Sequence, residues 1–452
     1  MTAQFTLAVV GHTNVGKTSL LRTLVRSTTF GVVSNRPATT RHAEAVRIDL
    51  GDAEGFELVD TPGFEDPSGL LDLVHTIRAD PRELGRDTLQ RFLAAPAADA
   101  EYAQEAKAIR QMLRADLLIL VVDAREPALG KFLDEFRLLG LLGKPTLVML
   151  NFVARPNAAP ARWRDAALAS GLHNVTEFDT VVFDADDEQR LWQQVELLLP
   201  GAASLCARIL ARNVAMRREQ RELAARLVAQ MLVDCTALRV RVDGESSDGP
   251  APQVRAAENR LHADLLGSYR FDERDYAASD LPLPTSQWTW DPFAPDVLEE
   301  LGLSLGLSAA KGAAVGATVD AFTAFHSLGA ATLIGAGIGA GLDALSRLGG
   351  VLREKLDGAR YLQIEPGVAV LLARRAVAFI ADLERRGHAA QGAVSARARV
   401  AEALRDEATL RELLARCRRH PEWSRFDPSP ALEDRARDDV IARLVTYLKG
   451  LL

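Results

Sequence analysis

Residues 11–20 read GHTNVGKTSL, in which glycines, a lysine and a threonine stand at the spacing of a phosphate-binding loop. The glycines let the backbone curl so that successive N–H groups point at phosphate oxygens. Lys17 would place a positive charge on the β- and γ-phosphates, and Thr18 would offer a hydroxyl to Mg²⁺. We therefore predict that a nucleoside triphosphate is held by Gly11, Asn14, Val15, Gly16, Lys17, Thr18 and Ser19.

A second group, DTPGF at residues 60–64, closes the apolar run FELVD. A carboxylate at the end of a strand can hold Mg²⁺, and the N–H of a nearby glycine can meet the γ-phosphate. Taken alone, DTPG would be an ordinary turn, because aspartate, proline and glycine all favour turns. About forty residues beyond a phosphate loop, the pattern instead favours Asp60 as a magnesium ligand and Gly63 as a γ-phosphate contact.

The segments NVGKTSLL, PATTRH and DTPGF resemble the Era/TrmE/EngA group of bacterial P-loop GTPases, whose pattern is GxxNVGKS, TTR and DTPG. The resemblance covers roughly residues 5–200. It implies that Thr40, or alternatively Thr39, is the switch I threonine that reaches Mg²⁺. It also implies that Asn14 matches an asparagine that helps several members bind a monovalent cation, usually K⁺. The candidate catalytic residues are Lys17, Thr40 and Gly63.

Phe64 stands where Ras-like proteins place a glutamine that orients the attacking water. A phenyl ring cannot hydrogen-bond a nucleophilic water, so hydrolysis must use another residue, the cation or a partner. We therefore expect slow intrinsic hydrolysis of GTP to GDP and phosphate.

The segment that recognises the base departs from the family pattern, because the family has NKxD where this chain has NFVA at residues 151–154. Asn151 is kept, but Phe152 replaces the lysine and Ala154 replaces the aspartate that accepts two hydrogen bonds from guanine. Loss of a charged acceptor typically costs a few kcal/mol. Phe152 can still stack on a purine, and stacking tolerates either base. Guanine is favoured by the resemblance, whereas the altered loop leaves a promiscuous ATPase/GTPase as an alternative.

The last family element, usually SA[KL], is assigned to Phe183-Asp184-Ala185. The backbone N–H of Ala185 would then donate to guanine O6 and disfavour adenine. A second option is that the Asp184 carboxylate turns toward the base.

These residues require a mostly parallel sheet with helices on both faces, because apolar runs alternate with helical patterns throughout residues 1–200. Strands are expected at residues 5–10, 45–50, 56–60, 117–123, 146–150 and 180–185. A helical insertion is expected around residues 66–114, either as a structural addition or as a nucleotide-sensitive arm. Residues 201–452 read as a mainly helical effector domain, since strand signals nearly vanish there.

Within residues 301–350 the chain is rich in glycine and alanine, and residues 321–342 contain no Asp, Glu, Lys or Arg. That length could span a bilayer, and repeated GxxxG spacing would let helices approach closely. His326 and the weak hydropathy favour a packed soluble hairpin instead. A nucleotide-gated hairpin that associates with a membrane is the competing hypothesis.

The net charge of −7 and pI near 5.7 argue against a general nucleic-acid binder. The strands and basic GxxG loop of an RNA-binding KH domain are also missing from the pattern after Pro200. Cys206, Cys235 and Cys417 lack metal-ligand spacing and read as buried thiols. Because the N-terminal residues do not resemble a signal peptide, we expect a cytoplasmic protein, or one peripheral to the inner face of the membrane. Its expected partners are a guanine nucleotide, a protein effector of unknown identity and a second copy in a nucleotide-dependent dimer.

Overall fold

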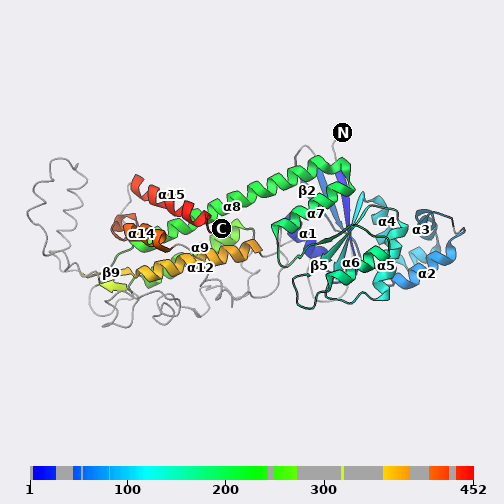
Figure 1. Ribbon diagram of the computed structural model, residues 1–452, viewed down its shortest axis with the longest axis horizontal. Helices are drawn as coiled ribbons and strands as arrows, with labels where there is room; N and C mark the ends of the chain where they lie inside the picture. The colour runs from blue at the N-terminus through cyan, green and yellow to red at the C-terminus, as the bar shows by residue number, and fades with distance from the viewer. Residues whose placement is uncertain are drawn as a thin grey trace, which may run out of the picture. The chain divides into compact units, whose positions relative to one another are not determined.

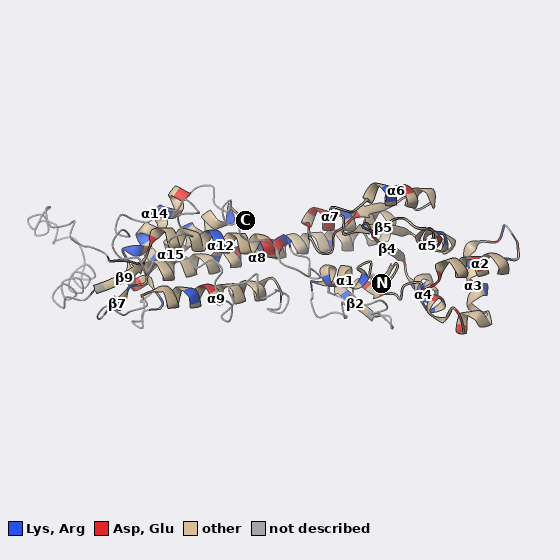
Figure 2. Ribbon diagram, turned by 90° about the horizontal axis from the view of Figure 1, so that it is seen from below, with Lys and Arg blue, Asp and Glu red and all other residues tan. Residues whose placement is uncertain are grey.

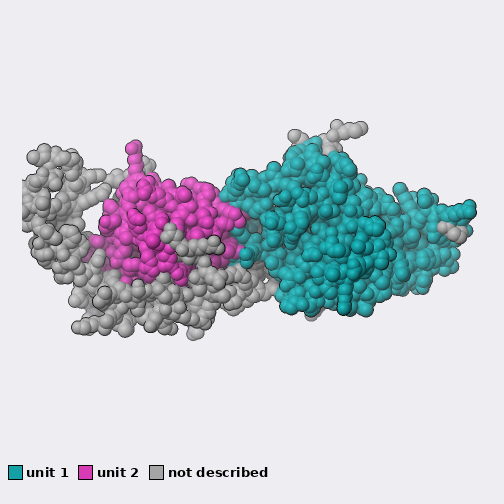
Figure 3. All heavy atoms as spheres, in the orientation of Figure 1, with its two compact units in different colours: residues 1–219, 269–275, 382–392 teal, residues 220–268, 276–381, 393–452 magenta. Residues whose placement is uncertain are grey.

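The computed structural model describes residues 4–26, 44–51, 54–80, 82–242, 249–271, 317–319, 360–385, 407–426 and 434–452. The chain forms two compact units, which Figure 3 shows in different colours. The first unit consists of residues 1–219, 269–275 and 382–392. The second consists of residues 220–268, 276–381 and 393–452.

The first unit is built on a six-stranded sheet with the strand order β2-β3-β1-β4-β5-β6 (Figure 1). Only the edge pair β2 and β3 runs antiparallel, whereas every other neighbouring pair is parallel. The predicted mostly parallel α/β architecture is therefore confirmed. The strands are β1 (Gln4–Val10), β2 (Glu44–Asp49), β3 (Gly55–Asp60), β4 (Leu117–Asp123), β5 (Thr146–Asn151) and β6 (Val175–Glu177).

Alternate residues of the central strands enter two separate hydrophobic cores, because successive side chains of a strand point to opposite faces. In β1, Ala8 and Val10 belong to one core while Leu7 and Val9 belong to the other. Helices α2 to α6 contribute residues to the first core, and α1, α7 and the start of α8 contribute residues to the second. Both faces of the sheet are buried, as parallel strands require.

The helices of this unit include three in the predicted insertion, namely α2, α3 and α4. Asp66 begins α2 as an N-cap that accepts from the N–H of Gly69 at 2.9 Å. The helices are α1 (Lys17–Val25), α2 (Pro67–Ile77), α3 (Gly85–Leu93), α4 (Ala103–Arg114), α5 (Gly130–Leu141), α6 (Pro160–Ala169) and α7 (Ala185–Leu198).

The predicted strand at residues 180–185 is wrong. The last strand, β6, ends at Glu177, and residues 178–184 form the connection to α7. The Asp179 carboxylate explains this local structure, since it accepts from the N–H groups of Val181 and Val182 at 2.9 and 3.0 Å. A backbone N–H that donates a hydrogen bond to a nearby side chain cannot also donate to a neighbouring strand, so these residues do not extend the sheet.

The second unit is mainly helical, as predicted, but its described residues also include a small sheet of order β7-β9-β8. Helix α8 (Ala203–Ala237) contributes residues to both units. The other helices are α9 (Ala251–Ser268), α12 (Pro366–Arg385), α14 (Glu407–Arg418) and α15 (Arg435–Lys449). The strands are β7 (Val240–Val242), β8 (Ala317–Val319) and β9 (Arg360–Ile364). Isolated three-residue strands carry too little periodicity to be recognised from sequence.

The segment proposed as a membrane hairpin, residues 321–342, lies outside the described residues. Among the helices that the structure describes, none is long and apolar enough to cross a bilayer. Cys206, Cys235 and Cys417 are buried free thiols, as predicted.

Candidate nucleotide-binding site

The phosphate-loop segment lies between β1 and α1, at the carboxyl edge of the sheet. Its backbone adopts positive φ at Gly11 (136°), Asn14 (65°) and Gly16 (99°). A Cβ on Gly16 would lie 2.3 Å from Asn151 Nδ2, and one on Gly11 would lie 2.4 Å from the carbonyl oxygen of Val121. Glycine is therefore required at both positions by conformation and by space.

Lys17 begins α1 and is buried against this loop. Its Nζ donates to the carbonyl oxygens of Gly11 and His12 at 2.8 and 2.9 Å. Burial lowers the pKa of Lys17, whereas the nearby Asp60 and Glu135 carboxylates act to raise it. The ammonium is thus held inside the curl of the loop, where the phosphates of a nucleotide would meet it.

The predicted magnesium ligands Thr18 and Asp60 are in direct contact, since Thr18 Oγ1 donates to Asp60 Oδ2 at 2.6 Å. Asp60 is the last residue of β3 and is 1% exposed. A hydroxyl and a carboxylate at one point form the hard oxygen donor set that Mg²⁺ prefers. Their residue types and position therefore fit a magnesium ion. The third predicted ligand, Thr40, lies outside the described residues, as does its alternative Thr39.

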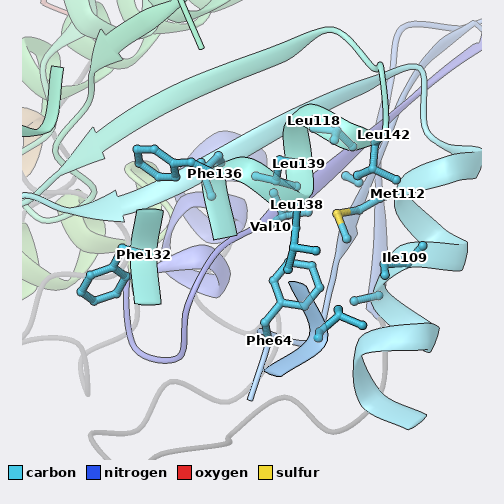
Figure 4. Packing of buried hydrophobic residues seen from close by; sticks show 14 of the residues in the cluster. Val10, Phe64, Ile109, Met112, Leu118, Phe132, Phe136, Leu138, Leu139 and Leu142 are labelled. Atoms are coloured by element: carbon cyan, nitrogen blue, oxygen red, sulfur yellow. The ribbon is translucent and has the colours of Figure 1, made fainter. Parts of the chain in front are cut away.

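The residues after Asp60 are held against the phosphate loop and against the insertion. A Cβ on Gly63 would lie 3.0 Å from the carbonyl oxygen of Gly11, so the two segments are in close contact. Phe64 is buried near Val10 and Ile109 in the core shared with α4, as Figure 4 shows. Helix α4 thus packs directly on the segment that carries the predicted γ-phosphate contact.

Glu105 of α4 strengthens this attachment. Its Oε1 accepts from the N–H groups of Glu65 and Asp66, both at 3.0 Å. The carboxylate is 3% exposed, so these hydrogen bonds are protected from water. Two backbone donors that immediately follow Phe64 are therefore fixed by α4.

Asn151 joins the base loop to two other segments and is completely buried. Its Nδ2 donates to the carbonyl oxygen of Val15 at 2.8 Å. Its Oδ1 accepts from Phe152 N at 2.8 Å, and from Thr180 N and Oγ1 at 3.0 and 3.1 Å. The phosphate loop, the end of β5 and the segment after β6 consequently meet at one side chain.

Phe152 has the backbone conformation φ 59°, which is rare for a bulky residue. Its ring reaches the phosphate loop, since ring atom Cζ lies 3.4 Å from the position of a Cβ on Gly16. The Arg125 guanidinium lies 4.0 Å from the ring centroid and is also ion-paired with Asp123 at 2.7 Å. An aromatic ring and a stacked guanidinium thus lie beside the predicted base position.

Ala185, the predicted guanine O6 donor, is the first residue of α7. Asp184 is the N-cap of that helix, and its Oδ1 accepts from Asp186 N at 2.8 Å. The residue that contacts Asn151 is instead Thr180, which follows the buried Asp179. Sequence reasoning missed Arg125, Asp179 and Thr180. The alternating run VTEF at residues 175–178 is the signal that could have placed the last strand directly before Asp179.

Beside the loop, His12 contacts helix α5. Its Nε2 lies 3.3 Å from Lys131 Nζ, and its ring meets Phe132 edge-on. Burial, then Lys131 and Lys17, lower the pKa of His12. One turn further along α5, Glu135 is buried near Lys17, and burial raises its pKa to about 7.

A buried carboxylate also links α1 to the first part of α8. Acidic residues occupy the first turn of α7 (Figure 2), and among them Glu188 is 2% exposed. It pairs with Arg26 at 2.9 Å and with Arg217 at 3.2 Å, and accepts from Asn213 Nδ2 at 3.0 Å. Arg26 ends α1 immediately before residues 27–43, which contain the predicted switch I. We call these four residues the Glu188 cluster.

The chain matches two protein families. The 50S ribosome-binding GTPase family matches residues 6–152, and the domain of unknown function DUF3482 matches residues 165–446. The first match therefore ends at Phe152, where the base-reading motif departs from its usual pattern.

Individual relatives cover parts of the chain. GTPase Era of Ureaplasma urealyticum is 39% identical over 79 residues, which are 17% of this chain and 26% of that protein. The probable GTP-binding protein EngB of Laribacter hongkongensis is 28% identical over 200 residues, which are 43% of this chain and 76% of that protein. The solved structure of Era with MgGDPNP and a 16S ribosomal RNA fragment has a TM-score of 0.31 and 16% identity, covering 55% of this chain and 75% of that one. The chain thus spans about a quarter of the Era protein it matches.

Proposed function

Because the chain belongs to the DUF3482 family and joins that domain to a 50S ribosome-binding GTPase domain, we propose that it is an Era-like regulatory GTPase. It binds GTP or GDP with Mg²⁺, hydrolyses GTP slowly and signals its nucleotide state to the helical part of the chain. The observation that carries this proposal is the 2.6 Å contact between Thr18 and Asp60 beside the buried Lys17. It unites a magnesium donor set with a phosphate-binding lysine.

Slow hydrolysis follows from the burial of Phe64, which has no hydrogen-bonding group for a water and is enclosed in the core. Asn14 adopts φ 65° within the loop, and the family resemblance assigns it to a K⁺ ion. A bound K⁺ would add positive charge near the leaving phosphates and raise the rate.

Signalling to α8 is supported by the Glu188 cluster. Arg26 directly precedes residues 27–43, which contain the predicted switch I threonine, and Arg217 belongs to the helix that continues into the second unit. A displacement of Arg26 would leave the buried Glu188 with a poorer set of partners, which is energetically costly. We infer that a movement of Arg26 at the end of α1 would be transmitted through Glu188 to Arg217 of α8.

Calorimetric titration of the purified chain with GTP, GDP and ATP in Mg²⁺ tests the proposal. We expect a preference for the guanine nucleotides, and we expect Lys17→Ala to abolish triphosphate binding. Lys131→Ala is the matched control, because its amine lies beside the same loop but contacts His12 instead. A Lys17→Ala chain that binds and hydrolyses GTP normally would refute the phosphate-loop assignment.

The potassium site is tested by comparing phosphate release in K⁺ and Na⁺. Asn14→Gly removes the side chain while preserving a residue that tolerates φ 65°. The natural chain should release phosphate faster in K⁺ than in Na⁺, and the Asn14→Gly variant should release it at the same rate in both salts. Equal rates in both salts for the natural chain would exclude the K⁺ role.

A promiscuous ATPase/GTPase is the second candidate, and a specific observation favours it. The stacked pair of Phe152 and Arg125 provides a surface that any purine can cover. Equal affinities for ATP and GTP in the same titration would establish this alternative, whereas a strong GTP preference would eliminate it.

A further inference from the structure

The base loop lacks a carboxylate where the family resemblance requires one, at Ala154. A buried carboxylate nevertheless lies beside this position, because Asp179 Oδ2 accepts from the backbone N–H of Ala154 at 3.2 Å. Asp179 is 4% exposed and comes from the segment after β6, not from the base loop itself. The structure therefore supplies from a neighbouring segment the chemical group that the motif has lost.

The surroundings hold this carboxylate in a defined position. Asp179 Oδ1 accepts from Val181 N and Val182 N, and the adjacent Thr180 is bonded to Asn151. Among the residues that the structure describes, the donor to Oδ2 is the Ala154 N–H. A carboxylate oxygen can accept more than one hydrogen bond, so Oδ2 retains capacity for a donor on a ligand.

The neighbouring side chains surround the same position. Asn151 connects Thr180 to the phosphate loop at Val15, and Phe152 extends from Asn151 over that loop. A purine whose phosphates lie at Lys17 and whose ring lies near Phe152 would thus have the Asp179 carboxylate nearby, where it contacts the base loop at Ala154.

The hydrogen-bonding pattern of the purine decides which base this carboxylate favours. Guanine offers two adjacent donors, N1–H and the 2-amino group, and a carboxylate accepts both. Adenine presents an acceptor at N1, which a carboxylate repels. Hypoxanthine keeps N1–H but lacks the 2-amino group, and xanthine carries an oxygen at that position.

We propose that Asp179 is the specificity-determining residue of this site and reads the N1–H and 2-amino donors of guanine in place of the missing aspartate at position 154. This assignment rests on the proposed GTP-binding function. It changes the expected selectivity of the NFVA loop from relaxed to guanine-specific.

The natural chain alone provides a first test, which needs no variant that could misfold. Its affinities for GTP, inosine triphosphate and xanthosine triphosphate are measured by calorimetry in Mg²⁺. We expect inosine triphosphate to bind roughly 10-fold more weakly than GTP, because one charge-assisted hydrogen bond is lost, and xanthosine triphosphate to bind still more weakly. Equal affinities for the three nucleotides would overturn the assignment.

Variants provide the second test, with a rescue that a purely structural role would not produce. Asp179→Asn should reduce the preference for GTP over inosine triphosphate, whereas Asp184→Asn, a control in the same connection, should leave it unchanged. Adding Ala154→Asp to the Asp179→Asn chain returns a carboxylate to the base loop and should restore the preference. Thermal unfolding of each chain reports whether it is folded.

The outcomes separate this assignment from the proposed function. An Asp179→Asn chain that keeps the full preference, or a double variant that fails to recover it while remaining folded, overturns the role of Asp179 and leaves GTP binding intact. If the natural chain binds none of these triphosphates, the proposed function fails and this assignment fails with it.

Discussion

Replacing Glu188 by glutamine should destabilise the first unit strongly. Its side chain is 2% exposed and pairs with Arg26, whose side chain is 12% exposed. Removing one member of a buried pair typically costs about 3–5 kcal/mol, because the remaining charge is left without its partner in a poorly solvated site. Arg217 is 27% exposed and is partly screened by water, so it adds little. Glutamine keeps one acceptor for Asn213, and we therefore expect a loss of about 3 kcal/mol.

A double-mutant cycle separates this pair from its surroundings. Glu188→Gln, Arg26→Gln and the combined variant are unfolded in urea and followed by tryptophan fluorescence, to which the buried Trp192 of the same helix contributes. The combined variant leaves no isolated charge within the pair, so the coupling free energy should be about 2 kcal/mol or more.

The control is the pair of Asp187 and Arg190, also on α7 and more exposed than the buried pair. The corresponding cycle of Asp187→Asn and Arg190→Gln should give a coupling of less than about 1 kcal/mol. If the cycle at Glu188 and Arg26 gave a value as small as the control, the buried carboxylate would not be holding α1, α7 and α8 together, and the coupling proposed for nucleotide signalling would be refuted.

Three further predictions concern buried polar groups around the site. Glu105→Ala removes the acceptor of two backbone N–H groups, so it should lower the free energy of unfolding by about 2 kcal/mol and speed hydrogen exchange at residues 65 and 66. Unchanged exchange at these residues would contradict their attachment to α4. Asn151→Ala removes four hydrogen bonds and should lower the free energy of unfolding by about 4 kcal/mol and weaken GTP binding; a loss below about 1 kcal/mol would contradict its joining role. Burial raises the folded-state pKa of Glu135 to about 7 from its ordinary 4.5, so the folded chain binds this proton more tightly and stability falls as pH rises between these values. The Glu135→Gln variant should therefore be more stable than the natural chain at pH 8, by up to roughly 3 kcal/mol, and equally stable near pH 4. Urea unfolding of both chains at both pH values measures this difference. A difference that does not change with pH would exclude the titration of Glu135.

The candidate phosphate and magnesium residues could be proposed from sequence because they lie in short local motifs. Gly11 to Thr18 occupy one loop and the first residues of α1. The family resemblance relates Asp60 to that loop through the DTPGF motif alone, without knowledge of how residues 66–114 pack. Strand alternation likewise predicted the sheet, since β1, β4 and β5 are apolar runs bounded by polar turns.

The end of the sheet could not be predicted in the same way. Residues 180–185 have the β-branched composition of a strand, but the Asp179 carboxylate binds the N–H groups of Val181 and Val182 and turns the chain toward α7. These local side-chain hydrogen bonds outweigh the strand propensity of the β-branched residues, because strand propensity depends on the structural context.

Sequence by itself determined the local chemistry of this protein, namely a phosphate loop, a carboxylate and hydroxyl suited to Mg²⁺, and an altered base loop. Tertiary structure decided which distant groups join that chemistry. Glu105, Glu188 and Asp179 belong to no recognisable motif, and each acts on residues between 25 and 162 positions away. The reason is physical: a buried carboxylate derives its role from the donors packed around it, and those donors are brought together only by the folded sheet and its helices.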